Sequence, residues 1–249
     1  MDADTELGGP GRRFPETEHS AVRAARSDDP ALRQRAVEAI AHAYWKPLYK
    51  YLRFRWHLSN DEAKDATQSF FADALARRLF ERFDPQRAAF RTYLRTCIDA
   101  HVANRARDAA RLKRGGGERL LSLDFEAAES ELSRHPPPPD ADLEARFEHE
   151  WIRNVFSLAV ERLRAVCTAQ NKLVHFTLFS RYDLRGDEQP ATTYDDLARE
   201  FALPITQVTN FLAWARRTFR AAVLDVLREC TAGDDEFREA AQRVLGVRP

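Results

Sequence analysis

Four consecutive prolines at residues 136–139 interrupt this 249-residue chain. Each proline fixes its own backbone angle and lacks an N–H group, so no helix can pass through such a run. Elsewhere apolar residues recur at helical spacing, whereas the alternating pattern of a half-buried strand is nearly absent. The sequence therefore predicts an all-α fold with two small helical domains, joined by an acidic, proline-rich linker at residues 115–141.

The first predicted domain, residues 28–114, contains well-marked helix starts. Asp29 can cap a helix that has Pro30 in its first turn, and we expect Pro47 to bend or end that helix. Ser59 and Glu62 have the spacing of a capping box, which opens the next helix. Together with the segments that follow, these signals predict a compact bundle of four helices.

Residues 83–117 are rich in arginine, although the net charge of the whole chain is zero. Phe90, Leu94, Ile98 and Val102 recur every four residues and predict a buried helix face. Arginines mixed with aromatic residues are typical of surfaces that bind single-stranded DNA. Arginines on the wet face of an amphipathic helix often only solvate it, so both interpretations remain open at this point.

The second predicted domain, residues 142–230, contains the spacing of a helix-turn-helix motif. Thr193 can cap its first helix, and the second helix begins at about Ile205. The outward face of that second helix carries polar and basic residues, namely Thr206, Gln207, Thr209, Asn210, Ala213, Arg216, Arg217 and Arg220. Amide side chains can read adenine in the major groove, and arginines can contact phosphates. An ordinary helical hairpin with a solvated face is the alternative.

Reactive groups are scattered along the chain. The three cysteines form no close pair, and the histidines lack metal-binding spacing. We therefore expect no catalytic residue, no metal site and no cofactor, so that the protein is not an enzyme.

Three expectations concern location and the chain ends. No apolar run approaches the roughly 18 residues of a membrane span, which predicts a soluble, cytoplasmic protein without a membrane partner. Residues 1–27 are expected to form a disordered leader. Residues 231–249 are expected to form a C-terminal extension of the second domain.

The order of these parts resembles bacterial RNA polymerase sigma factors of the sigma-70 family, in the extracytoplasmic-function (ECF) type that has only regions 2 and 4. Residues 60–71 are similar to region 2.2, which grips the polymerase. Residues 90–114 are similar to the segment that opens and reads minus-10 DNA, and residues 194–220 are similar to region 4.2, which reads the minus-35 element. The resemblance covers most of residues 32–230.

The resemblance implies three sets of binding residues. Core polymerase would be bound by Asp65, Gln68, Ser69, Phe70 and Phe71. Minus-10 DNA would be bound by Arg87, Arg91, Tyr93, Arg95, Asn104, Arg105, Arg107, Arg111, Lys113 and Arg114. Minus-35 DNA would be bound by the outward residues of the second helix, from Thr206 to Arg220.

The implied partners are promoter DNA and the polymerase core, through its β′ clamp helices and β flap. An anti-sigma factor is a further partner that the resemblance allows. Residues 83–91 would contain the loop that takes up a flipped base of the non-template strand. The acidic linker would thread through polymerase channels, with a solvated tether as the plain alternative. The alternative function is that of a free-standing helix-turn-helix regulator that acts without polymerase.

The chain departs from the family pattern at four positions. Tyr93 replaces the usual tryptophan, and Asn104 stands where aspartate is common. Pro204 stands where a capping serine is usual, and Trp214 occupies a position often filled by arginine. The base preferences of better-known relatives therefore do not transfer to this chain.

Overall fold

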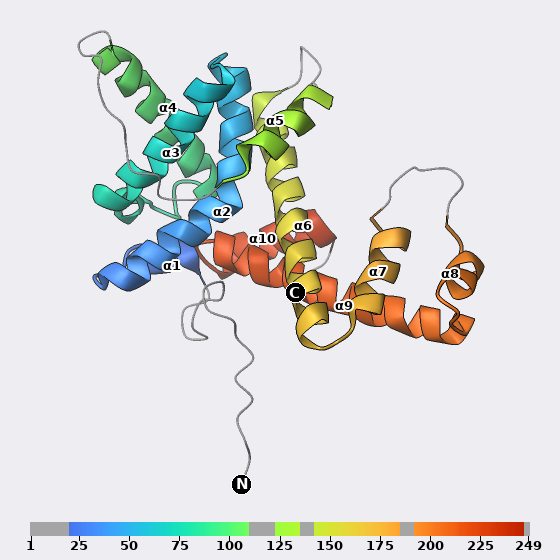
Figure 1. Cartoon of the computed structure of the whole chain (residues 1–249). Helices are drawn as coiled ribbons and strands as arrows, with labels where there is room; N and C mark the ends of the chain where they lie inside the picture. Colours follow the sequence, from blue (N-terminus) through green and yellow to red (C-terminus); the bar gives the residue numbers. More distant parts are fainter. Residues whose placement is uncertain (1–19, 110–122, 135–141, 185–191, 247–249) are drawn as a thin grey trace. The chain divides into compact units, whose positions relative to one another are not determined.

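The computed structural model describes residues 20–109, 123–134, 142–184 and 192–246, and these residues form helices joined by turns (Figure 1). Within those ranges no strand occurs, which confirms the all-α prediction. The helices are α1 (Ala21–Ala24), α2 (Pro30–Arg55), α3 (Asn60–Ala76), η1 (Leu79–Arg82), α4 (Phe90–Ala109), α5 (Phe125–Arg134), α6 (Leu143–Ala169), α7 (Leu173–Tyr182), α8 (Tyr194–Glu200), α9 (Ile205–Cys230) and α10 (Asp234–Leu245).

The chain divides into two compact units, and each is described separately below. Unit 1 comprises Met1–Asn154 and Leu227–Pro249, and unit 2 comprises Val155–Val226. The division falls inside α6 and α9, so each of these helices contributes to both units. Unit 1 therefore contains the start of α6 and all of α10, elements that the sequence prediction grouped with the second domain or its extension. Residues 1–19 of the expected disordered leader lie outside the described residues. For residues 20–27 the prediction is wrong, because they include helix α1, in which Ala21, Val22 and Ala24 are buried.

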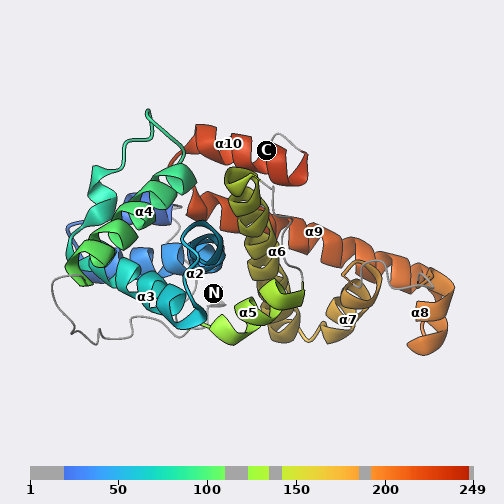
Figure 2. The same ribbon diagram turned by 90° about the horizontal axis from the view of Figure 1, so that it is seen from above.

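In unit 1, α2 lies between the α3–α4 pair and the start of α6, as Figures 1 and 2 both show. The ring of Tyr44 on α2 stacks on Trp151 of α6 at 6.4 Å between centroids. The same ring meets Phe90 of α4 edge-on at 5.8 Å. Phe90, Leu94 and Ile98 are fully buried, which confirms the predicted buried face of α4. Since Trp151 is also buried, the start of α6 belongs to the core of unit 1.

The predicted helix starts in unit 1 are confirmed. Asp29 accepts a hydrogen bond from the Ala31 N–H group at the start of α2. Ser59 and Glu62 form the complete capping box of α3, with each side chain bonded to the other residue's backbone N–H. These caps act over two or three residues, so they form wherever the local sequence permits them.

Pro47 was expected to bend or end the helix, and α2 does not end there but continues to Arg55. A proline inside a helix leaves the carbonyl four residues earlier without its usual donor. That carbonyl belongs to Ala43, and it accepts a hydrogen bond of 2.8 Å from the side-chain amide of Asn154. The helix persists because a residue of α6 supplies the missing donor.

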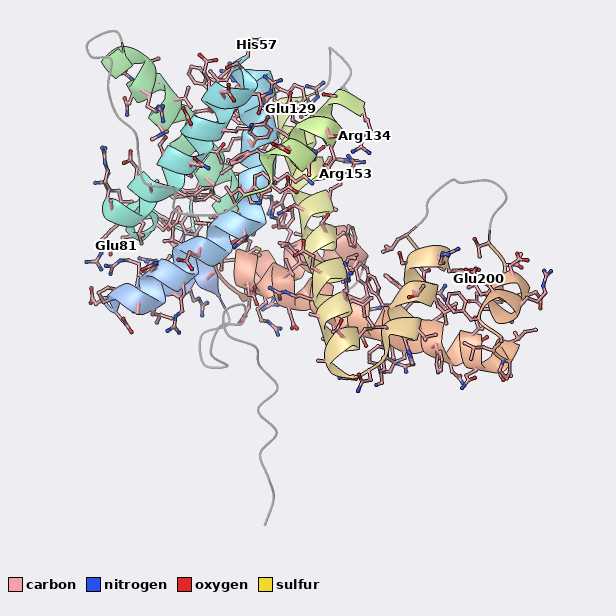
Figure 3. The ribbon with its side chains drawn as sticks, viewed as in Figure 1. His57, Glu81, Glu129, Arg134, Arg153 and Glu200 are labelled. Carbon is pink, nitrogen blue, oxygen red and sulfur yellow. The ribbon has the colours of Figure 1, made fainter. Side chains whose placement is uncertain are left out.

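A helix lies within the stretch expected to be a linker. Phe125 of α5 packs edge-on against Trp45 and Tyr49 of α2, at 5.0 and 5.3 Å. Glu129, labelled in Figure 3, accepts hydrogen bonds from Tyr49 and from Arg53 of α2. The described part of this acidic stretch is therefore packed on unit 1. The four prolines lie outside the described residues.

Unit 2 consists of the remainder of α6, α7, α8 and most of α9. Its core includes Leu178 of α7, Leu197 of α8 and Leu212 of α9, all fully buried. Glu200 of α8, labelled in Figure 3, forms an ion pair of 3.0 Å with Arg181 of α7. These contacts join α7, α8 and α9 into one small helical unit.

Candidate nucleic-acid interface

The helix-turn-helix predicted for residues 193–220 corresponds to α8 and α9. Thr193 and Asp196 form a complete capping box at the start of α8. The turn contains Ala202 in the left-handed backbone region, with φ of 51°. The N–H group of Leu203 bonds to the carbonyl of Ala198, which closes the end of α8 before α9 begins. The two helices are thus joined by a short, hydrogen-bonded turn.

Helix α9 is buried along one face and exposed along the other. Val208, Leu212 and Ala215 are fully buried. Thr206, Gln207, Thr209 and Asn210 are exposed, and Ala213 is half-buried. Among the described residues, no side chain bonds to the amides of Gln207 and Asn210, so both amides are available to an external partner.

The three arginines further along α9 differ in their surroundings. Arg217 and Arg220 are exposed. Arg216 instead donates hydrogen bonds to both carboxylate oxygens of Asp183 and to the hydroxyl of Tyr194. The carboxylate of Asp183 raises the pKa of the Arg216 guanidinium above its ordinary value. Arg216 therefore links α9 to the end of α7 and to α8, whereas Arg217 and Arg220 are open to solvent.

In unit 1, the arginines of α4 fall into two groups. Near the end of the described helix, Asn104, Arg105 and Arg107 are exposed. Arg105 donates to the backbone carbonyl of Asp65 at 3.2 Å and touches the hydroxyl of Ser69, so it lies beside α3. The last expected members of this basic stretch, Arg111, Lys113 and Arg114, lie outside the described residues.

The arginines near the start of α4 are covered by acidic residues. Arg91 forms an ion pair of 2.7 Å with Glu148 of α6, and only 11% of its side chain is exposed. Arg95 forms an ion pair of 2.9 Å with Glu144 of α6. Arg91 also lies over the ring of Trp151 at 5.5 Å. Both guanidinium groups thus have partners within unit 1.

The expected minus-10 set contains two further residues near the start of α4, Arg87 and Tyr93. Arg87 is exposed and forms an ion pair of 3.2 Å with Asp84. Tyr93 is half-buried, and its hydroxyl donates to the backbone carbonyl of Leu79 at 2.8 Å. Burial raises the pKa of Tyr93 well above its ordinary value. Tyr93 therefore packs against η1, whereas Arg87 is accessible.

The expected polymerase-binding residues on α3 also divide by exposure. Asp65 is exposed, and Gln68 and Ser69 are half-buried. Phe70 and Phe71 are buried, each with 1% exposure. The two phenylalanines belong to the core, so of the five expected polymerase-binding residues only Asp65, Gln68 and Ser69 reach the surface.

His101 of α4 contacts two polar side chains of α3, those of Ser69 and Asp73. Its Nε2 lies 3.0 Å from the Ser69 hydroxyl, and its Nδ1 lies 3.5 Å from a carboxylate oxygen of Asp73. Burial lowers the pKa of His101, with the nearby Arg105 charge acting in the same direction and the Asp73 carboxylate opposing it. The Ser69 hydroxyl also lies 3.2 Å from the carbonyl of Ala66, as a donor to its own helix. These contacts fix the spacing of α3 and α4.

Sequence reasoning missed the acidic residues that cover the start of α4. Glu144 and Glu148 are four residues apart on α6, and Glu236 lies on α10. The one signal in the sequence was the reversal of charge from the basic stretch to the acidic stretch that follows it. Charge reversal shows that pairing is possible, but it does not identify the partners.

Comparison of the chain with protein-family models, with curated proteins and with solved structures found no match. Over the described ranges, no helix is long and apolar enough to cross a membrane. The same ranges contain no cluster of three or more histidine, cysteine or acidic side chains able to hold a metal ion.

Proposed function

We propose that this chain is a sigma-type promoter-specificity subunit of RNA polymerase. In this proposal unit 2 reads duplex DNA through α9, and unit 1 binds polymerase and opens the adjacent DNA. The two units correspond to regions 4 and 2 of the sigma-70 family. The observation that carries the proposal is the start of α9, where polar side chains are exposed on a helix whose opposite face is buried.

The chemistry of α9 supports duplex recognition. Gln207 and Asn210 carry amides that can form paired hydrogen bonds with adenine in the major groove. Arg217 and Arg220 lie further along the helix, where guanidinium groups are suited to phosphates. Arg216 is paired with Asp183 in this structure, so the proposal places the phosphate contacts on Arg217 and Arg220.

The chemistry of unit 1 supports a second, separate contact with nucleic acid. Asn104, Arg105 and Arg107 form an exposed polar and basic surface at the end of α4. On the neighbouring α3, Asp65 and Gln68 offer a polar surface to a protein partner. The assignment of these surfaces to minus-10 DNA and to core polymerase rests on the order of the motifs along the chain.

The decisive experiment adds the purified protein to core polymerase and measures transcription from promoters of its own genome. We expect promoter-selective initiation, together with direct binding to core. Asp65→Ala combined with Gln68→Ala should weaken core binding and leave thermal unfolding unchanged. If the protein neither binds core nor selects a promoter, the proposal is wrong.

The second candidate function is a helix-turn-helix regulator that acts without polymerase, because unit 2 contains the whole motif by itself. A gel shift at moderate salt, with duplex promoter DNA and no polymerase, distinguishes the two candidate functions. Tight, sequence-selective binding without polymerase would favour the regulator. Under either function, Asn210→Ala should lower duplex affinity about tenfold, whereas Gln170→Ala, at an exposed amide in the turn after α6, should not.

A further inference from the structure

The side chain of Glu236, on the first turn of α10, is bonded to the first residue of α4. One carboxylate oxygen accepts a hydrogen bond of 2.8 Å from the backbone N–H of Phe90. The other accepts a hydrogen bond of 2.9 Å from the backbone N–H of Ala232, just before α10. Only 13% of the Glu236 side chain is exposed. One carboxylate therefore bridges two segments that lie far apart in the sequence.

Helix α4 needs such an acceptor because its own sequence does not supply one. The first N–H groups of a helix have no partner within the helix, and a polar residue at the N-cap usually accepts from one of them. The residue before Phe90 is Ala89, whose side chain has no acceptor, although its carbonyl accepts from Thr92 and Tyr93. Glu236 thus caps α4 from the other end of the chain.

The cap is reinforced by charge. Arg91 lies 3.9 Å from Glu236 and forms its closer ion pair with Glu148. Glu148 also pairs with Arg243 of α10, at 2.8 Å. This network of two acidic and two basic residues joins α10 and the start of α6 to the first turn of α4.

Glu236 also fixes the end of the loop at residues 84–89, which leads directly into Phe90. Phe83 and Phe90 are buried on either side of this loop and meet edge-on at 5.1 Å. Between them Gln86 and Arg87 are exposed. The loop is therefore anchored at each end by a buried phenylalanine and exposes polar side chains between them. The second of these phenylalanines is Phe90, whose backbone N–H donates to Glu236.

We propose that Glu236 is a positioning residue for DNA opening: it caps α4 from α10 and so fixes the loop at residues 84–89 against unit 1. The proposal rests on the proposed sigma-type function, which assigns this loop to the capture of a flipped base. Unstacking a base costs a few kcal/mol, and contacts between the loop and the flipped base must offset that cost. The loop therefore has to be held in place. In this arrangement α10 contributes to the part of unit 1 that opens DNA.

The experiment compares Glu236→Ala, Glu236→Gln and Asp235→Ala in the full-length protein with core polymerase. Asp235 is the matched control, because it is an acidic residue of the same helix turn whose exposed carboxylate pairs only with Arg238 among the described residues. Open-complex formation is measured on a duplex promoter and on the same promoter with a mismatched, pre-opened minus-10 region. Core binding and circular dichroism are recorded for every variant.

We expect Glu236→Ala to reduce opening of the duplex promoter about tenfold, the scale of a lost hydrogen bond to a charged group. Glu236→Gln keeps one acceptor and should fall between the alanine variant and the wild type. Asp235→Ala should match the wild type. The pre-opened promoter should restore Glu236→Ala to within about twofold of wild type, because the opening step is bypassed.

Two results would overturn the proposal. One is normal opening of the duplex promoter by Glu236→Ala. The other is an equal defect on the duplex and pre-opened promoters, which would reduce Glu236 to a general structural role. If the wild-type protein itself fails to bind core or to initiate, the sigma-type function fails instead, and the wild-type control identifies that case.

Discussion

The side-chain amide of Asn154 donates a hydrogen bond of 2.8 Å to the backbone carbonyl of Ala43. Ala43 stands four residues before Pro47, the residue whose missing N–H would otherwise have filled that position. Asn154 is also buried, with 6% exposure, and its amide reaches the carbonyl of His42 at 3.1 Å. A polar side chain of α6 thus allows a proline to sit inside α2.

A double-mutant cycle tests this relationship. Asn154→Ala alone should cost about 1–3 kcal/mol of unfolding free energy, because the carbonyl is left without a donor. In a Pro47→Ala background the new N–H can bond to Ala43, so Asn154→Ala should cost at least about 1 kcal/mol less. Urea unfolding of the four proteins measures both values. Equal costs in the two backgrounds would show that Asn154 does not compensate for the proline.

A second prediction separates two neighbouring arginines of α9. Arg216→Ala should destabilise the protein by about 1–2 kcal/mol, because Asp183 loses its bidentate partner. Arg217→Ala should change stability by less than about 0.5 kcal/mol, since Arg217 is exposed. In duplex binding, Arg217→Ala should reduce the slope of log affinity against log salt concentration by about one, because one phosphate contact is lost.

Thermal or urea unfolding and a salt titration of DNA binding measure the two effects. The reverse outcome, in which Arg216→Ala is stable but loses salt dependence, would return Arg216 to the phosphate-binding set. It would mean that the pair with Asp183 opens when DNA binds.

A third prediction concerns Lys50, which is almost fully buried in unit 1. Its ammonium group lies 3.0 Å from Glu131 of α5 and 2.6 Å from Glu150 of α6. Lys50→Met should cost about 2 kcal/mol, less than the roughly 3–5 kcal/mol of a fully buried pair, because both carboxylates are partly exposed to water.

Lys64→Met is the control for Lys50→Met, and urea unfolding measures both. Lys64 lies 3.9 Å from the highly exposed Asp61, so its loss should stay within about 0.5 kcal/mol. A cost for Lys50→Met no larger than that of the control would contradict the structural role of the buried ammonium group.

A fourth prediction concerns pH. Burial lowers the pKa of His101 in the folded protein, so between the folded and unfolded pKa values the unfolded chain binds more protons. Stability should therefore fall as the pH decreases below about 6.5, the ordinary pKa of histidine, toward the lowered pKa of His101 in the folded protein. His175 in unit 2 has a pKa lowered mainly by burial and should contribute in the same direction.

Urea unfolding at several pH values measures this dependence. His101→Gln should make the dependence shallower, because it removes a group whose pKa burial lowers in the folded protein. An unaltered slope in His101→Gln would assign the pH dependence to other groups.

Local sequence determined where several helices begin. The capping boxes of Ser59 with Glu62 and of Thr193 with Asp196 join residues three positions apart, so spacing alone identifies them. Helical periodicity likewise separated the buried Leu212 from the exposed Asn210 on α9. Both signals act within one or two helical turns.

The tertiary structure alone decided which charges and polar groups are paired. Asn154 with Ala43, and Glu236 with Phe90, are separated by 111 and 146 residues. Arg91 matched the pattern of a DNA-binding arginine in the sequence, but in the fold its guanidinium lies against Glu148. Periodicity shows which way a side chain points on its own helix. The partner that meets it depends on the packing of other helices, which no local spacing encodes.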